Sequence, residues 1–308
     1  MKLIVIALVS GYALSVVNIT GLLMSGIGLS YSDAKQVIAD AGILTQGYNH
    51  ELTEEENILL LLSKRKEFKS ISGYPKAPRV PPPELPHGLH YFKENRQDAI
   101  PFLKYLESRG FSKSLVIKLG YGYIVNGYTN TSKGKLLIHN HVVFFTYHDG
   151  KYVYWNTRSI DNGIPKSINA PSDGSCLGKG DLVYNLDYAI RNKLVVLTEG
   201  VPDALTLYPY GVATFGKMIS DVQIGILTNI PINIPLLVML DMDAKDQLIE
   251  VATKLYSIHR NTRMVFNKTK QDANSLGRSR AFKVLNKDNL IVPDQHGILE
   301  FNLRFRGL

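Results

Sequence analysis

The chain has very little cysteine: Cys176 is the single thiol among 308 residues. One thiol cannot form an internal disulfide, and no zinc site built on cysteines can be assembled from this chain. A phosphate-binding loop of the form G-x-x-x-x-G-K-[S/T] is also missing from the sequence. The lack of cysteine argues against a disulfide-stapled secreted protein and favours a cytoplasmic one.

Charge is missing from one long stretch near the start, between Leu3 and Ser32. The stretch is long enough to cross a bilayer, but glycine and polar residues interrupt it, and it has no clean signal-peptide pattern. We therefore expect a small β-rich element here. A membrane anchor over residues 3–29 is the less favoured alternative.

The overall composition is that of a globular protein, with 45% hydrophobic and 20% charged residues. A net charge of +8 and a pI near 9.3 point toward a polyanionic partner such as nucleic acid. Solubility alone is the simpler explanation of the same charge.

Proline marks the main boundary along the chain. Six of the sixteen residues from Gly73 to Gly88 are proline, which is typical of an extended linker. The sequence predicts a small N-terminal domain with helices, the linker, two larger parts and a tail. Their expected limits are residues 1–72, 73–91, 92–190, 191–290 and 291–308.

The first larger part begins with two predicted helices and continues as strands. The first helix is expected to bury Ile100, Leu103 and Leu106 and to end at Gly110, and Ser112 is expected to cap the second. The apolar runs between residues 135 and 156 are separated by "HDGK", which is a hairpin signal.

The second larger part alternates strands and helices from residue 193 onward. Its strands, such as "LVVLT" and "LLVML", are continuously apolar, which is typical of a parallel sheet covered on both faces. The predicted class is therefore α/β, or α+β overall, with a parallel sheet flanked by helices after a strand-rich subdomain and a small N-terminal domain.

Carboxylates follow the strands of this predicted sheet. Glu199 follows the first strand, Asp241 and Asp243 follow the third, and Asp272 follows the fourth. Ligands of open parallel sheets sit beyond the carboxyl ends of the strands, so these four groups should converge. Oxygen ligands in such a cluster suit Mg²⁺. Taken singly, each acid has a simpler explanation as a turn residue or a helix cap.

Three segments, "EGVPDAL", "LDMD" and "KQDANSL", resemble the signatures of the Toprim domain. Upstream, "KLLIHNHVVFFTYHDGKYVYWNTRSIDNGIPKSINAPSD" is similar to the strand-rich half of a bacterial or phage primase core. Arg158, Lys166 and Asn169 occupy the matching basic and amide positions. The resemblance covers about Asp98 to Leu285, in order, and is closest to the compact primases of phages.

Two positions depart from the family pattern. Asp246 stands where the family usually has a glycine after the paired aspartates. The N-terminal region also has no cysteine. The segment "YALSVVNITGLLMSGIGLSYSDAKQVI" nevertheless resembles the hairpin and following helix of a zinc ribbon without its ligands. Template reading would then come from a partner or from this altered domain.

The resemblance implies synthesis of short RNA primers by nucleotidyl transfer. Glu199, Asp241 and Asp243 would be catalytic, and with Asp272 they would hold two or more Mg²⁺ or Mn²⁺ ions, with no zinc site in the chain. Asp203 and Asp246 would support the cluster from behind. The residues expected to bind nucleic acid or nucleotide are Arg158, Lys166, Asn169, Lys217 and Lys270.

The expected partners are a single-stranded DNA template, ribonucleoside triphosphates, a replicative helicase as a separate protein and a zinc-bearing partner. Two other interpretations stay open. A Toprim nuclease would need only the acids and metal ions, and a non-catalytic primase-like subunit would bind DNA without synthesis. The basic residues of the strand-rich half favour the primase.

Overall fold

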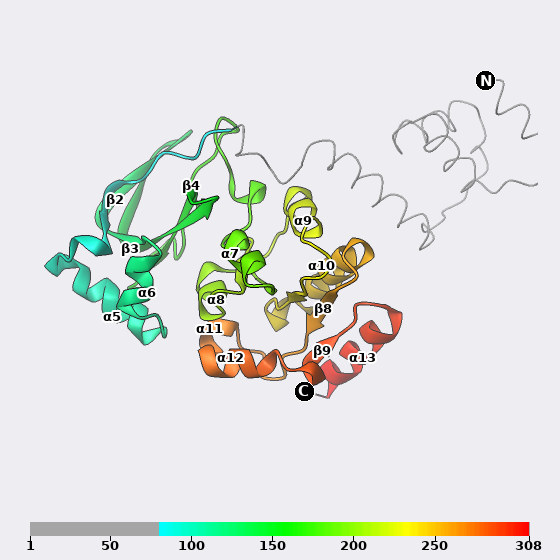
Figure 1. The fold of residues 1–308 in the computed structure, drawn as a ribbon. Coiled ribbons are helices and arrows are strands. Elements are labelled where there is room, and N and C mark those ends of the chain that lie inside the picture. Colours follow the sequence, from blue (N-terminus) through cyan, green and yellow to red (C-terminus); the bar gives the residue numbers. More distant parts are fainter. Residues whose placement is uncertain (1–79, 308) are drawn as a thin grey trace, which may run out of the picture. The chain divides into compact units, whose positions relative to one another are not determined.

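The computed structural model describes residues 80–307, which belong to one unit of the chain, Tyr74–Leu308 (Figure 1). The N-terminal domain expected at residues 1–72, its ribbon-like segment and the alternative anchor at residues 3–29 lie outside the described residues. Within the described part, no helix combines the length and apolar character needed to cross a membrane.

The first half is built on an antiparallel sheet in the order β1-β2-β3-β4. The hairpin between β3 and β4 turns at Asp149 and Gly150, both with positive φ, as a tight two-residue turn requires. The expected hairpin at "HDGK" is therefore confirmed. The strands are β1 (His87–Tyr91), β2 (Gly122–Thr131), β3 (Gly134–His148) and β4 (Lys151–Ser159).

Two helices, α5 (Ile100–Ser108) and α6 (Lys113–Lys118), precede β2. Ser112 caps α6 as expected, because its hydroxyl accepts the backbone N–H of Leu115 at 3.3 Å. The predicted buried face of α5 is partly wrong. Phe102 and Leu106 are buried, whereas Ile100 is 50% exposed because it lies in the first turn.

The end of the expected linker packs on this sheet. The indole N–H of Trp155 donates to the carbonyl of Glu84, and the Tyr152 hydroxyl donates to the carbonyl of Pro83, each at 2.8 Å. Prolines cannot donate to a strand ladder, so this segment is held through its carbonyls. The linker expected at residues 73–91 therefore ends earlier, and its last five residues form β1.

The second half contains a sheet in the order β6-β5-β7-β8-β9. Its first four strands are parallel, and β9 pairs antiparallel with β8 at the edge. The α/β class predicted from the alternating pattern is confirmed. These strands are β5 (Val195–Thr198), β6 (Gly211–Ala213), β7 (Leu236–Val238), β8 (Thr262–Val265) and β9 (Leu290–Ile291).

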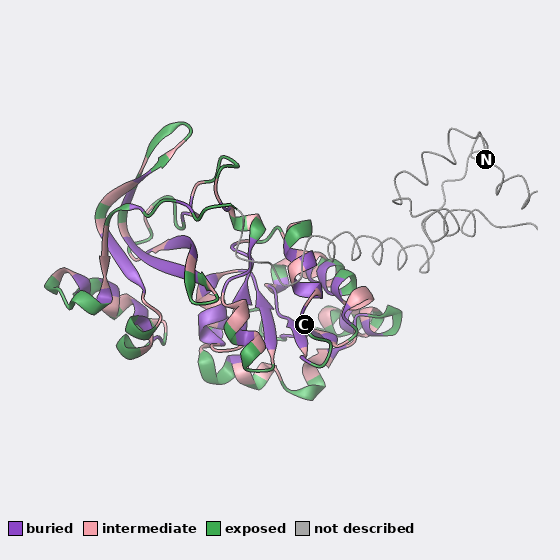
Figure 2. Ribbon diagram, turned by 45° about the horizontal axis from the view of Figure 1, so that its top comes forward, coloured by how far each residue is buried: buried purple, intermediate pink, exposed green. Residues whose placement is uncertain are grey.

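Helices cover both faces of this sheet, and the strands between them are buried (Figure 2). On β5, Val195 and Leu197 belong to one apolar cluster, whereas Val196 belongs to another on the opposite face. The helices are α7 (Leu186–Arg191), α8 (Val201–Thr206), α9 (Asp221–Thr228), α10 (Lys245–Ile258), α11 (Ala273–Leu276), α12 (Arg278–Val284) and α13 (Gln295–Arg306).

The chain after residue 290 is part of this fold. β9 extends the sheet, and α13 buries Phe301 completely, with its ring perpendicular to that of Phe266 at 5.4 Å. The expected tail at residues 291–308 is therefore structured over Gln295–Arg306. The sequence of α13 does not indicate which surface its apolar face covers. The structure shows that this face packs on the edge of the sheet.

The two halves share one core. Phe144 and Trp155 of the antiparallel sheet belong to the same buried cluster as Val201 and Leu205 of α8. Residues around Ile168 and Ala170 run beside β4, where Ala170 donates its N–H to the carbonyl of Trp155. The strand-rich half is thereby packed against the carboxyl edge of β5.

Candidate active site

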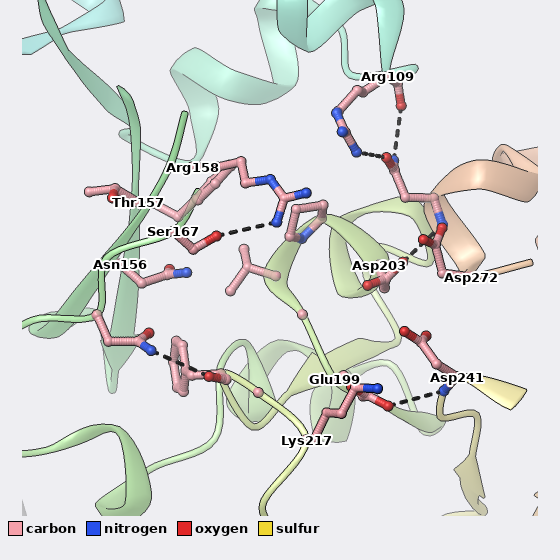
Figure 3. A pocket seen from close by; sticks show the side chains of 18 residues that line it. Arg109, Asn156, Thr157, Arg158, Ser167, Glu199, Asp203, Lys217, Asp241 and Asp272 are labelled. Carbon is pink, nitrogen blue, oxygen red and sulfur yellow. Dashed lines mark hydrogen bonds between the residues drawn. The ribbon is translucent and has the colours of Figure 1, made fainter. Parts of the chain in front are cut away.

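A cavity of about 320 Å³ lies between β4 and the carboxyl ends of β5 and β7 (Figure 3). Figure 3 shows the carboxylates of Asp203, Asp241 and Asp272 on one side and Arg158 on the other. The acids come from three separate connections of the parallel sheet, which is where such sheets place their ligands.

Glu199 directly follows β5, whose four residues are all buried. Its side chain is therefore held at the sheet edge and is only 8% exposed. Burial, followed by the negative charge of Asp241, raises the pKa of Glu199 to about 7. The backbone N–H of Asp241 donates to Oε1 of Glu199 at 3.3 Å and partly offsets this rise.

Asp241 and Asp243 lie at the exit of β7, where the chain turns into a short 3₁₀ helix, Met242–Ala244. Burial raises the pKa of Asp241, and the charges of Asp272 and Asp243 raise it further. Asp243 is exposed and receives the ammonium of Lys217 at 2.8 Å. Lys217 also lowers the pKa of both Glu199 and Asp241.

The donor set of this cluster fits a divalent cation. One oxygen from each of Glu199, Asp241 and Asp243 lies within 4.8 Å of the others. Three neighbouring carboxylates repel one another when they are ionised. A hard cation that prefers oxygen ligands, such as Mg²⁺ or Mn²⁺, stabilises them together. These three residues can therefore hold a metal ion.

Asp272 and Asp203 line the same cavity but stand outside that group of three. Asp272 caps α11 by accepting the N–H of Ser275. Burial, and then the charge of Asp272, raises the pKa of Asp203 to about 7, while the N–H of Asn274 donates to it at 3.0 Å. Asp203 is therefore itself part of the acidic wall of the cavity.

The opposite wall comes from β4 and the segment beside it. Arg158 donates from Nη1 to the hydroxyl of Ser167 at 3.2 Å, and Asn169 donates to the carbonyl of Phe215 at 3.4 Å. Two buried polar atoms in this wall have no hydrogen-bond partner: Nε of Arg158 and Oδ1 of Asn156. Buried polar atoms without partners are costly, so they mark a place where a polar ligand would be stabilised.

Three residues expected at the site lie elsewhere. Lys166 is exposed and does not line the cavity. Lys270 has its ammonium over the ring of Phe305 at 5.3 Å. Asp246 is 94% exposed and pairs with the adjacent Lys245 at 3.3 Å.

Sequence reasoning missed part of the cavity lining, namely Arg109, Asn156 and Asn274. Asn156 carried a usable signal, because residues two apart on a strand share a face and Arg158 was already a candidate. Asn274 lies within the quoted "KQDANSL" segment. Arg109 had no local signal, since it reaches the site across 165 residues of chain to bond Asn274.

No protein-family model matches the chain, and no curated protein matches it.

Solved structures do match. The E. coli primase catalytic core is 18% identical, with a TM-score of 0.55 over 70% of this chain and 81% of that one. The RNA polymerase domain of Mycobacterium tuberculosis primase DnaG is 17% identical, with a TM-score of 0.53 over 70% and 82%. A DnaG catalytic domain bound to ssDNA is 16% identical, with a TM-score of 0.55 over 83% and 85%. The described residues therefore have the fold of a DnaG-type primase catalytic core.

Proposed function

We propose that this chain is a DNA primase, which synthesises short RNA primers on a single-stranded DNA template by metal-dependent nucleotidyl transfer. One observation carries the proposal. In a primase-type fold, two members of a carboxylate cluster able to hold a metal ion, Glu199 and Asp241, line a cavity whose other wall carries Arg158 and Asn169.

Glu199, Asp241 and Asp243 would hold Mg²⁺ or Mn²⁺, with Asp272 at the edge of the same cavity. Divalent cations held there would supply activation of a 3′-hydroxyl nucleophile and charge neutralisation on the phosphates. Without a bound cation, the raised pKa of Glu199 allows this residue to hold a proton near neutral pH.

The basic wall would bind the phosphates of the incoming ribonucleotide or of the template. Arg158 has a planar fork that can contact two phosphate oxygens, and only one of its N–H groups is used by Ser167. Asn156 and Asn169 add amide groups that can orient the same ligand. Lys217, beside Asp243, places one more positive charge near the acids.

We also propose that a replicative helicase is a partner of this chain, whose printed sequence contains no phosphate-binding loop of the helicase type. A zinc-bearing partner is our proposed source of template reading, since a single cysteine cannot build a zinc ribbon. Action on chromosomal or phage DNA would place the protein in the cytoplasm.

The test is a primer-synthesis assay with the full chain, mixed-sequence single-stranded DNA, labelled ribonucleotides and Mg²⁺. The variant Asp241→Ala/Asp243→Ala removes two members of the carboxylate cluster. Asp246→Ala is the matched control, because Asp246 is an aspartate five residues from Asp241 that stands in solvent. We expect short RNA products from the wild type and from the control, and none from the double variant.

The same reactions separate the alternatives. Metal-dependent cutting of DNA without synthesis, lost in the double variant, would identify a nuclease. DNA binding with neither activity would show that the chain cannot make primers alone, either because it is a non-catalytic subunit or because it needs the zinc-bearing partner. Loss of synthesis in Asp246→Ala would show that this exposed residue belongs to the site.

A further inference from the structure

A second cavity, of about 280 Å³, adjoins the candidate active site and shares Arg109 with it. It lies where the end of α5 and the start of α6 meet α8 and the start of α12. Two arginines, Arg109 and Arg278, line it, and no carboxylate is among its lining residues. Its electrostatic character is therefore opposite to that of the acidic wall.

Hydrogen bonds connect both arginines to one pair of residues, Asn274 and Thr206. Asn274 accepts Nη1 of Arg109 and donates to the hydroxyl of Thr206 at 3.0 Å. Arg278 donates from Nη1 to the carbonyl of Thr206 at 3.1 Å. Both guanidinium groups are thereby fixed at one side of the cavity.

An aromatic ring also stacks against each of the two guanidinium groups. The guanidinium of Arg109 lies over the ring of Tyr105 at 5.1 Å, and that of Arg278 lies over Phe282 at 4.9 Å. Such stacking restricts the side chains while leaving the outer N–H groups available. Less rotamer freedom is then lost when an anion binds.

Neither arginine has an ion-pair partner among residues 80–307. Each guanidinium carries five N–H groups, and the hydrogen bonds above use one on each. Two adjacent positive charges without a carboxylate attract a phosphate group, and the planar fork matches its oxygens. The cavity therefore has the chemistry of a phosphate site.

We propose that Arg109 and Arg278 bind a backbone phosphate of the single-stranded nucleic acid that continues out of the active-site cavity. This inference rests on the proposed function. A free nucleotide offers the same phosphate chemistry. A strand is favoured because Arg109 borders both cavities, so one strand can contact the catalytic wall and this site with successive phosphates.

The experiment measures binding of the full chain to labelled single-stranded DNA by fluorescence anisotropy over a range of salt concentrations. Arg278→Gln removes the charge and keeps an amide that can donate to Thr206. Arg280→Gln is the matched control, because Arg280 lies two residues further along α12, is exposed and lines neither cavity. We expect several-fold weaker binding for Arg278→Gln and wild-type binding for the control.

The salt dependence identifies the cause. Losing one phosphate contact on a single strand should reduce the slope of log K against log salt by about 0.7. Arg278→Lys retains the charge and should retain the wild-type slope. The assignment would be overturned by a reduced salt slope in Arg278→Lys. It would also be overturned if Arg280→Gln lost as much DNA affinity as Arg278→Gln, or if Arg278→Gln bound DNA like the wild type.

A parallel titration with a labelled ribonucleoside triphosphate distinguishes the source of the phosphate. If Arg278→Gln weakens nucleotide binding and leaves DNA binding intact, the strand assignment is wrong. A wild-type chain that fails to bind single-stranded DNA at any salt concentration counts against the proposed function itself. Wild-type binding with no effect at Arg278 counts against this inference alone.

Discussion

At Glu199, burial and the charge of Asp241 act in the same direction and raise the pKa to about 7, from an ordinary value of 4.5. The folded chain therefore holds a proton that the unfolded chain releases at lower pH. Stability from this group is complete below pH 4.5 and is lost as the pH rises through 7.

We predict that the metal-free protein becomes less stable between about pH 5 and pH 8, by up to about 3 kcal/mol from Glu199 alone. Glu199→Gln is neutral at every pH, so the decrease should be smaller in this variant. Urea unfolding in the presence of EDTA measures the difference. Glu250→Gln, at an exposed position on α10, should behave like the wild type, and an equal decrease in Glu199→Gln would contradict the prediction.

Arg158 and Lys166 make a second contrast at the scale of single residues. The sequence predicts phosphate contacts for both, but only Arg158 lines the cavity. We predict that Arg158→Ala raises the KM for ribonucleotides about tenfold or more, because it removes hydrogen bonds to a charged group. Lys166→Ala should change the KM little. Synthesis rates over a range of nucleotide concentrations test this, and equal effects would show that Lys166 also reaches the substrate.

Among the elements, α13 contributes directly to the second half. Its Phe301 is completely buried against Phe266, whereas Leu303 on the same helix is 59% exposed. The helix therefore covers the sheet through one face and leaves the other to solvent.

We predict that Phe301→Ala lowers the free energy of unfolding by about 3–5 kcal/mol, as expected for a large buried aromatic side chain. Leu303→Ala should lower it by less than about 0.5 kcal/mol. Denaturant unfolding of both variants gives the comparison. A small effect at Phe301 would mean that residues 295–306 are not a fixed part of the fold.

The limits of elements were harder to predict than their types. The alternating pattern after residue 193 correctly indicated a parallel sheet, because buried parallel strands are continuously apolar. In contrast, β1 was hidden by neighbouring prolines and β9 by its length of two residues. Both strands exist because partner strands elsewhere in the chain, β2 and β8, provide their hydrogen bonds.

For the whole molecule, metal binding should be coupled to stability. Glu199, Asp241 and Asp243 repel one another when they are ionised, and a bound cation removes that repulsion. We predict that saturating Mg²⁺ or Mn²⁺ raises the melting temperature, with about 2.7 kcal/mol gained at a concentration about one hundred times the Kd.

Thermal unfolding with and without metal tests this at about pH 8, above the raised pKa of Glu199 of about 7. Asp241→Ala/Asp243→Ala should lose the shift and should melt above the metal-free wild type, because fewer like charges remain. Asp246→Ala should keep the shift, since Asp246 is in solvent. A shift of equal size in the double variant would place the metal ion elsewhere.

The sequence by itself determined the class of the fold, the succession of its parallel strands along the chain and the acids at their ends. Those features are local: a buried strand has a continuous apolar pattern, and its exit is the next residue. Glu199, Asp241 and Asp272 could therefore be named from the sequence alone, and all three line the cavity.

Only the tertiary structure decided which basic and amide groups face those acids. Arg109 and Asn274 are 165 residues apart in the chain, and Asn169 and Phe215 are 46 apart, yet each pair is hydrogen-bonded at the site. Lys166 and Lys270 look equivalent to Arg158 in sequence, but packing directs them elsewhere. Long-range packing leaves no periodic signal, so these contacts could be known only from the folded chain.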